Sequence, residues 1–134
     1  MDQQAKATAF RRMHLEPPIL VLPNAWDVAS AKVLAAVPGC RALATTSAAV
    51  ARSLGFEDGE QAPRDVMVVA AGRIAAAVEL PVSADLEAGY GDPVGTARAA
   101  LKRSTVRRAG MNSSRPNRSS MVRDASPTRA GPLR

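Results

Sequence analysis

Two carboxylates, one residue apart, follow an apolar segment in "LPVSADLEAGYGDP", residues 80–93. Alternate side chains of a β-strand face the same way, so Asp85 and Glu87 would share one face at the carboxyl end of a strand. Two negative charges this close repel each other unless a cation lies between them or one is protonated. Mg²⁺ binds one or two carboxylates and keeps several waters. The spacing fits a magnesium site, and it fits exposed acids at a strand end about equally well.

A second group of polar residues follows the apolar segment "CRALATTS", residues 40–47. This predicted strand ends in three hydroxyl residues, Thr45, Thr46 and Ser47. Their hydroxyls suit an anionic substrate, or they bond to nearby backbone. The next loop carries three acids, Glu57, Asp58 and Glu60, and spacing alone does not choose among them. All of these residues reach the edge where Asp85 lies if the strands are parallel.

Strands and helices alternate along the chain. Apolar runs predict strands at residues 19–22, 40–47 and 80–87, and helical patterns cover 27–39, 62–79 and 92–108. Such alternation is typical of parallel strands joined by right-handed crossovers. Two α/β architectures remain open, a doubly wound open sheet and the first part of a (β/α)8 barrel. The first strand–helix turn has no glycine fingerprint for a dinucleotide, which disfavours the open nucleotide-binding sheet.

The predicted helices begin at recognisable residues. Asp27 is the expected N-cap of the first helix, and Pro63 begins the second. Asp92 is expected to cap the third helix, with Pro93 at its first position.

Charge is distributed unevenly over the 134 residues. Residues 102–134 hold nine of the 18 basic residues and one of the 12 acids, and their few apolar residues follow no period. We expect this tail to be disordered beyond a helix extension to about Arg108. It could neutralise phosphates, but it has no aromatic residue for base stacking, so nucleic-acid binding is the weaker interpretation. With one cysteine, no signal peptide and no apolar span, we expect a cytoplasmic protein without a membrane segment.

Three stretches carry a specific combination of motifs: "LVLPNAWDVASAKVLAAV", "ALATTSAAVARSLGFEDGE" and "LPVSADLEAGYGD". Together they resemble the isocitrate lyase/phosphoenolpyruvate mutase superfamily, from about Phe10 to Leu101. The resemblance implies a partial TIM (β/α)8 barrel formed by the first three βα units. Residues 1–101 are then the N-terminal part of the barrel, and residues 102–134 a basic tail, either disordered or an out-of-frame coding sequence.

The resemblance also implies a chemistry. Family members bind Mg²⁺ or Mn²⁺ and cleave or form C–C or P–C bonds of small oxo- or hydroxycarboxylates through a metal-stabilised enolate. On that pattern Asp85 is the direct metal ligand, and Glu87 and Asp58 hold the metal through waters; these three are the predicted catalytic acids. The predicted substrate-binding residues, which would receive the carboxylate, are Thr46, Ser47 and Ala48.

The sequence departs from the family inside the third predicted helix, after about Leu101. Family barrels have about 250 residues and a fourth strand that ends in Glu-Asp, whereas this chain reads "RAGMNSSRPNRSS". We therefore expect the chain to be inactive by itself. The alternatives are a homo-oligomer, a non-catalytic remnant that pairs with a full-length relative, or, more weakly supported, a nucleic-acid binder.

Overall fold

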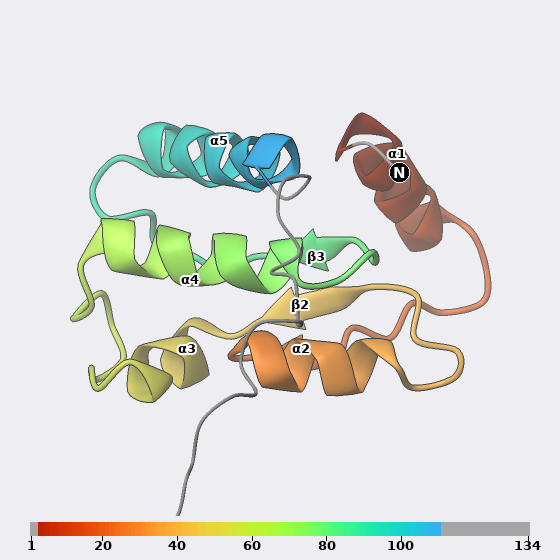
Figure 1. Ribbon diagram of the computed structural model, residues 1–134, viewed down its shortest axis with the longest axis horizontal. Helices are drawn as coiled ribbons and strands as arrows, with labels where there is room; N and C mark the ends of the chain where they lie inside the picture. The colour runs from red at the N-terminus through yellow and green to blue at the C-terminus, as the bar shows by residue number, and fades with distance from the viewer. Residues whose placement is uncertain (1–2, 111–134) are drawn as a thin grey trace, which may run out of the picture.

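The computed structural model describes residues 3–110, with the side chains of residues 3–103. This part of the chain is an α/β structure with one three-stranded sheet (Figure 1). Its elements are α1 (Gln3–Leu15), β1 (Asn24–Ala25), α2 (Val28–Ala35), β2 (Leu43–Thr45), α3 (Ser47–Ser53), α4 (Arg64–Ala76), β3 (Val82–Ser83) and α5 (Pro93–Gly110). None of the helices in this part is long and apolar enough to cross a bilayer.

The three strands are parallel and lie in the order β1-β2-β3. Ala25 pairs with Thr45, and Leu43 pairs with Val82. The predicted alternation of strands and helices with parallel pairing is therefore confirmed. Parallel order brings the carboxyl ends of β2 and β3 to the same edge of the sheet.

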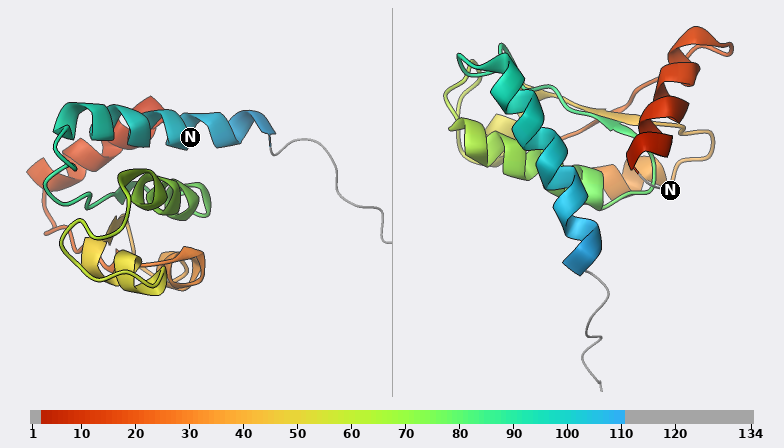
Figure 2. Two further views of the ribbon diagram at one scale, coloured as in Figure 1. Left: turned by 90° about the vertical axis from the view of Figure 1, so that its left-hand side faces the viewer. Right: turned by 90° about the horizontal axis from the view of Figure 1, so that it is seen from above.

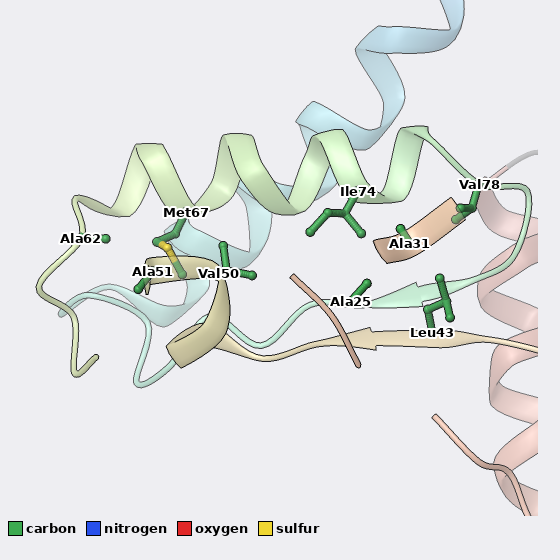
Figure 3. Close-up of a cluster of buried hydrophobic side chains, with 9 residues drawn as sticks. All are labelled: Ala25, Ala31, Leu43, Val50, Ala51, Ala62, Met67, Ile74 and Val78. Atoms are coloured by element: carbon green, nitrogen blue, oxygen red, sulfur yellow. The ribbon is translucent and has the colours of Figure 1, made fainter. Parts of the chain in front are cut away.

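The hydrophobic core lies between the sheet and helices α2, α3 and α4. Helix α4 lies between α2 and α5 (Figures 1 and 2). Most of the residues in the hydrophobic core are small, as expected for a chain in which only 3% of the residues are aromatic. Figure 3 shows the cluster, which consists of Ala25, Ala31, Leu43, Val50, Ala51, Ala62, Met67, Ile74 and Val78.

The two faces of the sheet differ in composition. Ala25, Leu43 and Thr45 are buried beneath the helices. The alternate residues, on the other face, are Asn24, Ala44 and Ser83, which are exposed or half-buried. These three are neighbours in the register, so this second face is a row of small and polar side chains.

The starts of α2 and α5 follow the sequence expectations, whereas α1 was not predicted. Asp27 caps α2 in a reciprocal box with Ser30, whose backbone N–H donates to Asp27 Oδ1 at 2.7 Å. Asp92 Oδ1 accepts from the N–H of Gly95 at 2.9 Å at the start of α5. Helix α5 continues to Gly110, two residues past the predicted end. The predicted disorder of the basic tail falls almost wholly on residues 111–134, which lie outside the described residues.

The first predicted strand is wrong in position. Residues 19–22 form no strand, and Ile19 and Val21 are 89% and 71% exposed. The hydrogen bonds to β2 begin one residue later, where the Pro23 carbonyl accepts from the N–H of Ala44 at 3.0 Å. Residues 36–42, which precede β2, form a turn and irregular chain, so they offer the apolar run no partner strand.

The third predicted strand is much shorter than expected. Strand β3 ends at Ser83, and the N–H of Asp85 donates to the Thr45 hydroxyl at 3.0 Å rather than to a main-chain carbonyl. Glu87 has a left-handed backbone, with φ of 55°. Strand alternation therefore does not extend to Asp85 and Glu87, and other contacts orient their carboxylates.

Candidate functional site

The ends of β2 and β3 are joined through Ser47 and Asp85. Ser47 is the first residue of α3, two positions after the last residue of β2, and only 8% of it is exposed. Asp85 Oδ2 accepts from the Ser47 N–H at 3.1 Å and from the Ser47 hydroxyl at 2.9 Å. Ser47, predicted to bind the substrate, and Asp85, predicted to bind the metal, thus lie in direct contact.

The Asp85 carboxylate has a third donor. Its Oδ1 accepts from the N–H of Glu87 at 3.0 Å. Burial raises the pKa of Asp85, but the hydrogen bonds from Ser47 and Glu87 outweigh it and leave the pKa below its ordinary value. Asp85 is therefore ionised at neutral pH, the form that binds a cation.

Glu87 is held by the loop of residues 54–63. The N–H of Glu60 donates to Glu87 Oε2 at 2.7 Å, and Glu60 Oε1 accepts from the N–H of Tyr90 at 2.7 Å. The sequence spacing does not show which of the three acids of this loop reaches the site. In the structure it is Glu60 that contacts residues 84–92, the acidic loop. No local sequence signal marks this choice, because it depends on contacts between residues 27 and 30 positions apart.

Asp58, the predicted third acid, makes a local hydrogen bond. It is exposed, and its Oδ1 accepts from the N–H of its neighbour Gly59 at 3.0 Å. Among the residues that the structure describes, no three His, Cys, Asp or Glu side chains are grouped to hold a metal. The three-acid metal set therefore stays a prediction.

The pair of Asp85 and Glu87 nevertheless fits a hard divalent cation. Both offer carboxylate oxygens, which Mg²⁺ and Mn²⁺ prefer. Each accepts hydrogen bonds from neighbouring N–H groups, as ligating carboxylates usually do. Asp85 and Glu87 are thus the two described residues that could hold such a cation, and by themselves they do not form a complete cage.

The predicted substrate-binding residues lie at the start of α3. Thr46 is the N-cap residue, without a side-chain capping bond, and both Thr46 and Ala48 are half-buried. Ser47 gives both of its donors to Asp85. Thr45, absent from the predicted set, contacts the site through its hydroxyl, which accepts from Asp85.

Tyr90 completes the surroundings of the acids. It packs against the core cluster, and its hydroxyl is buried with no hydrogen-bond partner among the described residues. Burial raises the pKa of Tyr90 above 10.0, and the charges of Glu87, Glu60 and Asp85 raise it further. The phenol is therefore neutral and lies within the field of the three acids.

Known structures match about three quarters of the chain. A crystal structure of a proposed phosphonomutase from Burkholderia cenocepacia J2315 is 43% identical with a TM-score of 0.67, and the match covers 73% of this chain and 41% of that one. A proposed lyase/mutase from the same organism is 42% identical with a TM-score of 0.67, covering 74% and 36%.

Sequence relatives and a family model agree with these structures. Two uncharacterised proteins of Mycobacterium tuberculosis are each 40% identical over 84 residues, which is 63% of this chain. The matched part spans 32% of the length of each relative. The model of the phosphoenolpyruvate phosphomutase family matches residues 10–113, past the Leu101 to which the resemblance in the sequence extended. The chain belongs to the phosphoenolpyruvate phosphomutase family.

Proposed function

We propose that this chain carries the first part of an active site for metal-dependent enolate chemistry on small oxo- or hydroxycarboxylates. The reaction class is cleavage or formation of a C–C or P–C bond, as in a lyase or phosphonomutase. The observation that carries the proposal is the contact of Ser47 with Asp85, which holds an ionised carboxylate at the carboxyl edge of the sheet. Active sites of (β/α)8 barrels are built at that edge.

Each residue has a proposed role. Asp85 would bind Mg²⁺ or Mn²⁺ directly, with Glu87 and Asp58 holding it through waters. The cation, when bound, would act as a Lewis acid toward the enolate oxygen. The N–H groups of Ser47 and Ala48, with Thr46 beside them, would receive the substrate carboxylate. Because Asp85 engages both donors of Ser47, a carboxylate at that position requires Asp85 to turn away from Ser47.

We also propose that the three βα units are part of a (β/α)8 barrel. Parallel strands with helices on one face, and a row of Asn24, Ala44 and Ser83 on the other, support this. In a barrel that second face points inward. Since the match spans 41% and 36% of the two Burkholderia chains, these 134 residues would bind the cation without completing the catalytic site.

Magnesium titration of the purified chain tests the metal part. We expect binding that Asp85→Asn weakens at least about tenfold, in the range typical of lost metal-site contacts. Glu57→Gln, at an exposed acid of the neighbouring loop, is the matched control and should leave the affinity unchanged. Absence of binding at millimolar Mg²⁺ would refute the metal site in this chain.

Phosphorus NMR tests the catalytic part. With phosphoenolpyruvate and Mg²⁺, a phosphomutase moves phosphorus from oxygen to carbon, and the phosphonate has its own resonance. We expect no conversion by the 134-residue chain. Conversion that Asp85→Asn abolishes would overturn the proposed inactivity and support the reaction class directly.

A second candidate function is pairing with a larger barrel of the same family or with another copy. Two large apolar side chains, Val33 on α2 and Val37 just after it, are more than half exposed, which favours a covering partner. Analytical ultracentrifugation of the chain, alone and mixed with a purified full-length relative, tests this role. A monomer in both samples would reject it.

A further inference from the structure

We propose that Glu60 is a positioning residue that braces the acidic loop, residues 84–92, through its side chain. This inference rests on the proposed function, because bracing matters where Asp85 and Glu87 must be held for a cation. Its structural basis is a pair of hydrogen bonds in opposite directions. Glu60 donates its N–H to Glu87 and accepts the N–H of Tyr90, each at 2.7 Å.

The backbone conformation shows why a brace is needed. Glu60, Glu87 and Tyr90 have φ of 60°, 55° and 57°, a region that residues other than glycine seldom adopt. Such conformations persist only where surrounding contacts over-determine them. The two bonds of Glu60 join all three left-handed residues, so they stabilise this conformation of the loop.

The brace complements an anchor at the far end of the loop. The buried hydroxyl of Thr96 donates to the Gly89 carbonyl at 2.9 Å, which ties the loop to α5. At its near end, Asp85 is held by Thr45 and Ser47. Glu60 contacts the loop at Glu87, between these two points, and at Tyr90, one residue past Gly89. The other acids of its own loop, Glu57 and Asp58, are exposed.

Amide hydrogen exchange of the full chain tests the brace without any metal. Glu60→Asn is the sharp variant, because asparagine tolerates a left-handed backbone and its shorter side chain cannot reach Tyr90. We expect exchange of the Tyr90 N–H to accelerate at least about tenfold, as loss of one hydrogen bond to a charged acceptor predicts. Glu60→Gln keeps an acceptor of the same length and should restore protection to within about threefold.

Magnesium affinity is the second readout. We expect Glu60→Asn to weaken Mg²⁺ binding about tenfold, as outer-shell changes do, and Glu60→Gln to restore it. Glu57→Asn is the matched control and should change neither readout. If Glu60→Asn does not fold, Glu60→Asp serves in its place, because it keeps the charge and loses the reach.

The two proposals fail in different ways. If the wild-type chain binds no Mg²⁺, the metal part of the proposed function is rejected, and exchange of the Tyr90 N–H still decides the brace. Unchanged exchange in the shortened variants overturns the brace. The brace is also overturned if Glu60→Gln accelerates Tyr90 N–H exchange as much as Glu60→Asn does. The charge of Glu60, and not its hydrogen bonds, would then be what matters.

Discussion

Ser47 donates two hydrogen bonds to a single oxygen of Asp85, one from its backbone N–H at 3.1 Å and one from its hydroxyl at 2.9 Å. The two residues are 38 positions apart in the sequence and belong to neighbouring strand ends. This contact fixes the orientation of Asp85 and contributes to its lowered pKa.

The first prediction concerns Ser47→Ala. This change removes the hydroxyl donor and keeps the backbone donor, so the pKa of Asp85 should rise part of the way toward its ordinary value of 3.8. NMR titration of the Asp85 side-chain carboxyl carbon measures the shift. Thr46→Ala, next in the chain and without a side-chain capping bond, is the control. An unaltered Asp85 titration in Ser47→Ala would show that the hydroxyl contributes nothing.

The second prediction concerns stability in acid. A carboxyl with a lowered pKa contributes stability that is present above its unfolded value and is lost as the pH falls through its folded value. Asp85 and Asp27 both have lowered pKa values, so the free energy of unfolding should fall as the pH drops below about 4. Urea unfolding across this range measures the fall. Asp85→Asn should make it shallower, and an equally steep fall in the variant would contradict the role of Asp85.

The third prediction concerns Tyr90, the single tyrosine of the chain. Its raised pKa means that the folded protein holds the phenolic proton more tightly than the unfolded chain. Stability from this group is therefore complete below pH 10.0 and declines as the pH rises further. Ultraviolet absorbance of the phenolate reports Tyr90 alone.

The same titration identifies the charges involved. Glu87→Gln and Glu60→Gln should each lower the Tyr90 midpoint, because each removes a negative charge near the phenol. Glu57→Gln serves as the exposed control from the same loop. A wild-type midpoint at or below 10.0 would mean that the phenol lies outside the field of the acids.

The fourth prediction concerns Thr96→Val, a substitution of nearly equal shape. Thr96 is 1% exposed, and its hydroxyl donates to the Gly89 carbonyl. The change leaves that carbonyl without its donor, so the free energy of unfolding should fall by about 1–3 kcal/mol. Thermal or urea unfolding measures it. Thr8→Val, at an exposed position on α1, should change stability by less than about 0.5 kcal/mol, and equal losses in the two variants would argue against the anchor.

The starts of α2 and α5 could be predicted from the sequence because the signals are local. The Asp27 carboxylate and the N–H of Ser30 are three residues apart, as are the Asp92 carboxylate and the N–H of Gly95. Strand limits depend instead on distant partners. The apolar run that begins at Ile19 has the composition of a strand, but pairing with Ala44 begins only at Pro23.

The candidate site likewise has one part that could be predicted from the sequence and one part that could not. Parallel strand order alone places Ser47 and Asp85 at one edge of the sheet. The part played by Glu60 could not be predicted, because it requires left-handed backbone at glutamate and tyrosine positions, which sequence propensities disfavour. The orientation of Asp58 likewise follows from a bond to its own neighbour, Gly59, which spacing does not reveal.

Strand β3 is terminated by a side chain, since the Thr45 hydroxyl takes the Asp85 N–H that a main-chain carbonyl would otherwise accept. Insertions or deletions after Asp85 would consequently leave the pairing of β2 with β3 in register, because that pairing is complete before the loop begins. The length of this loop can thus change while the underlying sheet stays constant.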